Sequence, residues 1–184
     1  MTHLTKSCYV VLGLISKDPS SGYRLKTILA KIGRFYWSES NAQIYPILKK
    51  LESAELLTSV LDESSGARKK RIYTITEKGQ KILEEWLHRS TEVTPYREEI
   101  LLKLAFSQYV QDSNVLEMLA QYKLDIEVQI KDNNIVTDHL EDDHAGKPDE
   151  PYLYMIHDHV KLLLQAKLDW VNMMIERVKG NKTA

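Results

Sequence analysis

The chain has 184 residues, an apolar content of 43% and a formal net charge of −1 at pH 7. This length fits one or two small domains, and this apolar content is enough for a hydrophobic core. The near-neutral total excludes a chain that is basic throughout, but residues 1–90 carry 15 Lys and Arg against 9 Asp and Glu, a net charge of +6. Residues 91–184 carry 10 against 17, a net charge of −7. This asymmetry indicates that the first half meets a polyanion, unless the acidic half is only a solvated helical surface.

The cysteine content and the N-terminus indicate the compartment. Cys8 is the single cysteine, so no intrachain disulfide can form and a reducing compartment is favoured. The N-terminus lacks the layout of a signal peptide, and the apolar run at residues 9–15 is too short to span a bilayer. We therefore expect a cytoplasmic protein without a membrane partner.

The first 90 residues are predicted to form four helices and a two-stranded hairpin. In chain order these are helices over residues 5–16 and 21–35, a turn at 17–22 between them, a helix from Ser40, strands at 57–61 and 71–75, and a helix over 76–90 capped by Thr76. A helix followed by a hairpin can enter the DNA major groove while the hairpin tip, the wing, reaches the neighbouring backbone.

The third predicted helix has one apolar face and one polar face. Ser40 and Gln43 have the spacing of a capping box, in which each side chain satisfies a free backbone N–H of the first turn. Asn and Gln can pair with adenine edges, and Lys can reach guanine or phosphate. Pro46 predicts a tight or distorted first turn, because an interior proline removes one backbone bond. The polar face consists of Asn41, Gln43, Tyr45, Lys49, Lys50 and Glu52.

Four consecutive cations, Arg68, Lys69, Lys70 and Arg71, lie at the tip of the predicted hairpin. A lone basic run of this kind is usually a solvated tip. Beside a helix with a polar face it favours contact with DNA, because clustered cations neutralise phosphates and so supply most non-specific affinity.

The second half is predicted to be helical after a linker at residues 91–96. Helices are expected over residues 97–106, 113–140 and 152–178, with an acidic loop at 138–151. Two long helices do not close a core alone, so a second copy of the chain is the expected partner. The stripe expected to face inward on the last helix comprises Leu153, Ile156, Val160, Leu163, Trp170 and Met174.

The pattern resembles the PadR family of bacterial transcriptional regulators. E-E-I-L-L-K-L at 98–104 resembles the start of the helical C-terminal domain of the longer members. One departure is A-E-L at 54–56, where the family usually has a glycine after the third helix, so a different helix end is expected. The segments that carry the resemblance are S-G-Y at 21–23, F-Y-W at 35–37, Q-I-Y-P-I-L-K-K-L-E at 43–52, R-I-Y-T-I-T-E-K-G at 71–79 and W-L at 86–87.

The resemblance implies a mainly α protein that binds double-stranded DNA as a homodimeric repressor. Residues 1–92 would form a winged helix-turn-helix domain with a two-stranded wing, and residues 93–184 a helical dimerisation and effector domain. In members that respond to small molecules, a ligand site lies between the two domains, and a small aromatic or phenolic effector is expected there. Phenolic-acid repressors and related virulence activators share this length and layout, so the sign of regulation stays open.

Residues from three segments are the candidates for DNA contact. Tyr45 is either a core tyrosine or a phosphate contact, and contact is favoured because Ile44 and Leu48 already fill the core. The candidates are Tyr23, Arg24, Ser40, Asn41, Gln43, Tyr45, Lys49, Lys50, Arg68, Lys69, Lys70 and Arg71.

Trp86, His157 and Trp170 are the candidates for effector binding. The tryptophans could stack on an aromatic ligand, but helix packing is the ordinary role of such rings. His139, Asp143 and His144 invite a zinc interpretation, yet no second ligand cluster accompanies them, so neither a metal nor a cofactor is predicted.

No phosphate-binding glycine loop, nucleophile elbow or zinc-protease pair is present, so an enzyme is not expected. The sequence predicts a dimeric, sequence-specific DNA-binding regulator, a repressor released by a small effector. The alternative is an activator or a protein-interaction module on the same scaffold.

Overall fold

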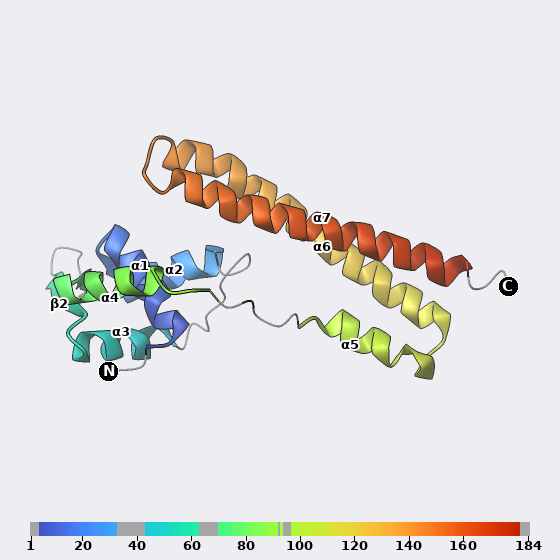
Figure 1. Ribbon diagram of the computed structural model, residues 1–184, viewed down its shortest axis with the longest axis horizontal. Helices are drawn as coiled ribbons and strands as arrows, with labels where there is room; N and C mark the ends of the chain where they lie inside the picture. The colour runs from blue at the N-terminus through green and yellow to red at the C-terminus, as the bar shows by residue number, and fades with distance from the viewer. Residues whose placement is uncertain (1–3, 33–42, 63–69, 92, 94–96, 181–184) are drawn as a thin grey trace. The chain divides into compact units, whose positions relative to one another are not determined.

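The computed structural model describes residues 4–32, 43–62, 70–91, 93 and 97–180, excluding the side chains at 31–32 and 138–144. The chain divides into two compact units, residues 1–93 and residues 94–184 (Figure 1). The predicted fold class, an N-terminal winged helix-turn-helix followed by a helical region, is confirmed.

The described part of the first unit contains helices around a small antiparallel sheet. β1 lies beside β3, and β3 lies beside β2. β1 was not expected, because two serines in a turn cluster carry no strand signal; they form a strand by pairing with Tyr73 and Ile72 on the free edge of β3. The elements are α1 (Lys6–Lys17), β1 (Ser20–Ser21), α2 (Gly22–Ile32), α3 (Ile44–Ser53), β2 (Leu57–Asp62), β3 (Lys70–Ile75) and α4 (Glu77–Leu87).

The core of this unit is formed by apolar side chains from α1, α2, α3 and the sheet. Leu12, Leu25 and Leu48 are completely buried, and Cys8 is buried among them, as expected for a small core residue. Each such leucine contributes about 1.5–3 kcal/mol of hydrophobic stabilisation. This core holds α3 by its apolar face and leaves the opposite face accessible.

α3 begins later than the sequence predicts. Gln43 occupies the N-cap position and makes no side-chain capping hydrogen bond, and Ser40, the other member of the predicted capping box, lies outside the described residues. Pro46 is therefore the third residue of the helix, within the first turn, where backbone N–H groups have no intrahelical partner. The first backbone bond, from the Ile47 N–H to the Gln43 oxygen, is 3.0 Å, an ordinary helical length, so this bond shows no sign of the distortion expected at Pro46.

α3 ends in a left-handed cap at Glu55, whose φ is +60°. The Leu56 N–H donates to the Leu51 oxygen and the Glu55 N–H donates to the Glu52 oxygen, both at 2.9 Å. This is the Schellman pattern that glycine usually completes. The expectation of a different helix end is wrong, because Glu55 adopts the conformation that a glycine would take.

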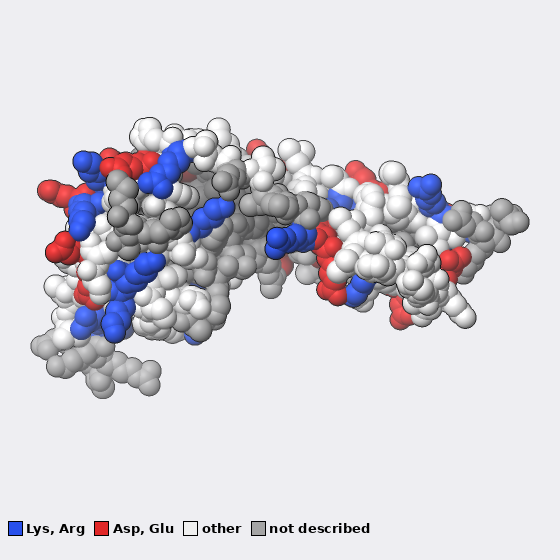
Figure 2. Space-filling view, turned by 60° about the horizontal axis from the view of Figure 1, so that its bottom comes forward, with Lys and Arg blue, Asp and Glu red and all other residues white. Residues whose placement is uncertain are grey.

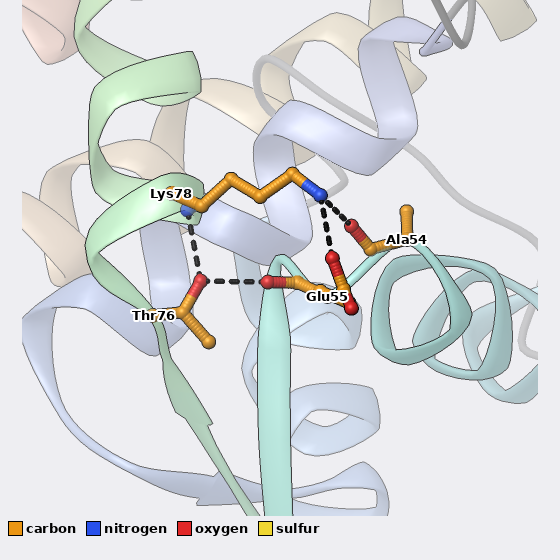
Figure 3. A network of polar contacts seen from close by, with 5 residues as sticks. Ala54, Glu55, Thr76 and Lys78 are labelled. Carbon is orange, nitrogen blue, oxygen red and sulfur yellow. Dashed lines mark hydrogen bonds and ion pairs between the residues drawn. The ribbon is translucent and has the colours of Figure 1, made fainter.

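Side chains from the start of α4 hold this cap in place (Figure 3). The Lys78 ammonium donates to the Ala54 oxygen and to a Glu55 carboxylate oxygen, both at 2.9 Å, and the Thr76 hydroxyl donates to the Glu55 oxygen at 2.8 Å. Thr76 also accepts from the Gly79 N–H at 3.0 Å, so its predicted role as the cap of α4 is confirmed. A Cβ on Gly79 would lie 2.2 Å from the Leu56 oxygen, which explains the glycine there.

The second unit is helical in its described residues. α6 and α7 pack along each other as an antiparallel pair (Figure 1). α6 continues to His144, so the loop expected from residue 138 is wrong over its first seven residues. None of the helices in the described part of the chain combines the length and apolar character that a bilayer crossing requires. The elements are α5 (Glu99–Ala105), the 3-10 turn η1 (Ser107–Tyr109), α6 (Asp112–His144) and α7 (Glu150–Gly180).

The seam between α6 and α7 contains a polar pair among apolar side chains. His157 is 5% exposed and Asn133 is 2% exposed, and the His157 Nδ1 lies 2.9 Å from the Asn133 Oδ1. Burial lowers the pKa of His157, while nearby Asp158 acts in the opposite direction. Of the predicted inward stripe of α7, Val160 is buried, whereas the other members are not among the buried residues. The buried residues of α7 are His157, Val160, Leu164 and Val171.

Candidate nucleic-acid interface

The polar face of α3 is the first component of the candidate interface. Gln43, Tyr45, Lys49 and Lys50 are exposed, and Tyr45 retains 57% of its surface, in agreement with its predicted outward position. Ile44, Ile47, Leu48 and Leu51 are buried on the opposite face. Ser40 and Asn41 lie outside the described residues. The helix therefore presents an amide, a phenol and two ammonium groups that take no part in the core.

The start of α2 lies against the start of α3. A Cβ on Gly22 would lie 2.7 Å from a ring carbon of Tyr45, so a larger residue here would require the Tyr45 ring to shift. Ser21 caps α2 by accepting from the Arg24 N–H at 3.2 Å. Tyr23 is 73% exposed, and the exposed guanidinium of Arg24 pairs with Asp18 at 2.5 Å. Tyr23 and Arg24 thus stand at the helix end that contacts Tyr45.

The wing is the third component. Arg68 and Lys69 lie outside the described residues, while Lys70 and Arg71 are exposed at the start of β3. Consecutive strand residues point to opposite sides of a sheet, so Lys70 and Arg71 have different surroundings. Lys70 is opposite Asp62 in the register of β2 and β3.

Arg71 lies on the sheet face that also carries Tyr73. Its guanidinium lies 3.4 Å from the Ser59 hydroxyl and 3.6 Å from a carboxylate oxygen of Glu52, near the end of α3. The Ser59 hydroxyl donates to the same carboxylate at 2.5 Å. Burial raises the pKa of Tyr73, and the charge of Glu52 adds to this effect. Sequence reasoning placed Glu52 on the polar face of the helix but did not connect it to the wing.

Basic side chains are spread over the accessible face of the first unit, with acidic ones between them (Figure 2). In the described parts of α3 and β3, the exposed cations are Lys49, Lys50, Lys70 and Arg71. Surface cations at this density attract a polyanion, and polar groups on a helix can then distinguish base edges.

The three effector candidates have different neighbours within the units to which they belong. Trp86 on α4 stacks on Tyr9 of α1 with ring centroids 4.7 Å apart, and so packs within the first unit. The rings of Trp170 and Tyr122 pack edge to face with their centroids 6.2 Å apart, and His157 forms a hydrogen bond with Asn133. His157 and Trp170 are thirteen residues apart on α7, or ~20 Å at a rise of about 1.5 Å per residue.

An open pocket of about 920 Å³ lies between α5, α6 and α7, and the sequence pattern did not predict it. Glu98 and Lys167 form an ion pair at its wall, and the Tyr122 hydroxyl donates to Glu98 at 2.5 Å. The pocket wall therefore places a carboxylate, an ammonium and a phenol that already bind one another beside apolar side chains such as Ile100, Ile126 and Leu164.

A metal centre finds no support among the described side chains, which contain no group of three or more His, Cys, Asp or Glu residues placed to hold an ion. The side chains of His139, Asp143 and His144 lie outside the described set.

Comparison with known proteins gives matches in both sequence and structure. Residues 11–85 match the Transcriptional regulator PadR-like family. The negative transcriptional regulator PadR of Bacillus subtilis (strain 168) is 34% identical over 100 residues, which are 53% of this chain and 54% of that protein. The chain thus spans little more than half the length of the curated relatives that it matches.

Two solved structures of Bacillus subtilis PadR share the fold of this chain. The structure in complex with operator DNA has a TM-score of 0.84 at 23% identity, covering 95% of this chain and 99% of that chain. The structure in complex with p-coumaric acid has a TM-score of 0.76 at 23% identity, covering 93% and 97%. Residues 11–85, which match the family, contain α2, α3, the strands β2 and β3 and most of α4. These elements build the candidate interface. Over residues 11–85 the chain is similar to the PadR-like family of transcriptional regulators.

Proposed function

We propose that this protein is a dimeric, sequence-specific DNA-binding regulator that represses transcription until a small effector releases it. The observation that carries the proposal is the polar face of α3, which presents Gln43, Tyr45, Lys49 and Lys50 outward from a well-packed core. This face would enter the major groove, where Gln43 reads bases and the lysines reach guanine or phosphate. The wing cations Arg68, Lys69 and Lys70 would hold the adjacent backbone.

Exposed apolar side chains on the second unit support a homodimer. Leu124, Val128 and Ile135 on α6, and Met155, Leu162 and Met173 on α7, are all more than half exposed. The residues of each set recur at steps of four, seven or eleven, so each set lies along one stripe of its helix. A second copy covers such stripes economically, and a two-fold dimer places two copies of α3 about 34–36 Å apart, one turn of DNA, or a multiple of that distance.

The effector part of the proposal rests on the pocket between α5, α6 and α7 and on the p-coumaric acid complex of Bacillus subtilis PadR. A small aromatic or phenolic acid would lie there against Ile100, Ile126 and Leu164, beside the paired Glu98 and Lys167. Release of DNA requires that the ligand bind the two dimer shapes unequally, because equal binding shifts no equilibrium. A thermal-shift screen should therefore be followed by a direct measurement of DNA release, with p-coumaric acid as one of the probes.

The decisive experiment is DNA binding by the chain of 184 residues. Duplexes selected from a random pool should share a pseudo-palindrome. Replacing Lys69 and Lys70 with Ala should weaken binding to all duplexes alike and reduce the dependence of log K on log salt by ~0.9 for each phosphate that is no longer neutralised. Gln43→Ala should instead reduce the preference for the selected duplex over random DNA. Absence of any duplex binding would contradict the proposal and favour a protein-interaction module.

A further inference from the structure

Glu52 stands in an unexpected place for an acidic residue. Tyr45, Lys49 and Glu52 follow each other at steps of four and three residues and therefore share one face of α3. Glu52 is the only acidic residue in α3, and its side chain is 33% exposed. A carboxylate at the end of the row that would face phosphates lowers affinity for DNA unless its charge is compensated.

The compensation comes from the wing. The Ser59 hydroxyl of β2 donates to the Glu52 carboxylate at 2.5 Å, and the Arg71 guanidinium of β3 lies 3.6 Å from the same oxygen and 3.4 Å from Ser59. The three side chains come from three separate elements. Their contacts therefore tie the last turn of α3 to both strands that carry the wing.

Arg71 is placed for this contact by the pairing of the strands. Ser59 is opposite Tyr73, and Leu61 is opposite Arg71, so Ser59 and Arg71 are diagonal neighbours on one sheet face. That face is the one that buries Tyr73 and Leu57. Lys70 belongs to the other face and has no part in these contacts.

We propose that Glu52, Ser59 and Arg71 form a brace that sets the position of the strands β2 and β3 relative to α3, and that Arg71 is a positioning residue and not a phosphate contact. The inference rests on the proposed use of α3 and the wing to bind DNA. A fixed wing lets helix and hairpin engage groove and backbone together without an ordering cost on binding. The acidic residue on the DNA-facing row is thereby explained.

The sign of one mutational effect separates this proposal from simple electrostatics. If charge alone matters, removing the negative charge of Glu52 strengthens binding to DNA. The loss of Glu52 would also leave Arg71 able to reach a phosphate. If the brace matters, Glu52→Ala should instead weaken binding to a duplex selected by the parent chain, by about fivefold. Glu52→Gln keeps an acceptor for Ser59 and should lose less affinity than Glu52→Ala.

Salt titrations give the second readout. Arg71→Gln should weaken binding while leaving the slope of log K against log salt within error of the parent, because Arg71 neutralises no phosphate. The double variant Glu52→Ala with Arg71→Gln should bind as well as either single variant, since both remove the same brace. Lys70→Gln is the matched control on the other sheet face and should reduce the slope by ~0.9.

Three further controls exclude a general charge effect and partial unfolding as causes. Glu85→Gln removes an exposed charge from α4 of the same unit and should leave affinity unchanged or slightly higher. Stoichiometric titration gives the active fraction of each variant, so that partial unfolding is not mistaken for weaker binding. Circular dichroism spectra like the parent's show that the variants are folded.

Tighter binding by Glu52→Ala, or a slope reduced by ~0.9 in Arg71→Gln, would overturn the brace and make Arg71 a phosphate contact. Additive losses of affinity in the double variant would also overturn it. Failure of the parent chain to bind any duplex would contradict the proposed function itself, and so is distinguishable from failure of the brace.

Discussion

At the scale of single residues, the cap between α3 and β2 shows how a residue other than glycine can adopt the left-handed conformation that glycine usually takes there. Left-handed backbone costs a non-glycine residue on the order of 1–2 kcal/mol. Glu55 adopts it with a φ of +60°, and Thr76 and Lys78 bind its carbonyl and carboxylate oxygens (Figure 3). The hydrogen bond and ion pair with Lys78 lower the pKa of Glu55. Interactions from the next helix thus offset local strain.

The first prediction concerns this position. Glu55→Gly should raise the melting temperature by roughly 2–4 °C, because relief of the left-handed strain outweighs the loss of an exposed ion pair. Glu55→Ala keeps the Cβ and loses the pair with Lys78, so it should melt below the parent. Differential scanning calorimetry measures both. A glycine variant that melts no higher than the alanine variant would show that the backbone is not strained.

At the scale of elements, the seam between α6 and α7 is set by a polar pair that the apolar pattern did not reveal. The predicted stripe on α7 ran through Ile156, Leu163 and Trp170, whereas His157, Leu164 and Val171 are buried. Asn133 and His157 satisfy each other across the seam. Each would be costly to bury alone, and pairing them favours one register of the two helices.

The second prediction is that this pair makes stability depend on pH. Burial lowers the pKa of His157 from 6.5, so the unfolded chain binds the proton more readily than the folded chain. The contribution of His157 is therefore fully present above about pH 6.5 and declines as the pH falls toward the folded pKa. The free energy of unfolding, measured with urea at pH 7.5 and 5.5, should fall less in His157→Gln than in the parent. His159→Gln, at an exposed site two residues away, should behave like the parent.

At the scale of the whole molecule, charge and apolar surface are divided between the two units. The first half carries a net charge of +6 and the second half −7. The exposed apolar stripes proposed to form the dimer lie on α6 and α7 of the acidic half. This division fits a protein in which one unit binds DNA and the other brings two copies together.

The third prediction tests that division. Leu162, which is 71% exposed on α7, should lie within the dimer interface, so Leu162→Glu should weaken dimerisation at least tenfold, or ~1.4 kcal/mol. Sedimentation velocity measures the change, and affinity for a palindromic duplex should fall with it. Leu87→Glu, at an exposed leucine on α4 of the first unit, is the control and should leave the dimer intact. If both variants and the parent have the same sedimentation coefficient, Leu162 does not lie in the dimer interface.

The sequence by itself determined the winged helix-turn-helix, because its signals are local. The spacing of Ile44, Leu48 and Leu51 defines one face of α3, Thr76 caps α4, and alternation defines β2 and β3. The outward position of Tyr45 follows from the same spacing. Each of these features depends on residues a few positions apart, where periodicity and capping chemistry are decisive.

Only the tertiary structure decided the features that join distant residues. β1 exists because Ser20 and Ser21 meet the edge of β3, Glu55 holds its left-handed conformation through contacts with α4, and Arg71 meets Glu52 across β2. The burial of Asn133 depends on His157, 24 residues away along the chain. The sequence does not show which polar residues are buried, because a polar side chain can be buried only with a hydrogen-bond partner, and only the folded chain brings that partner close.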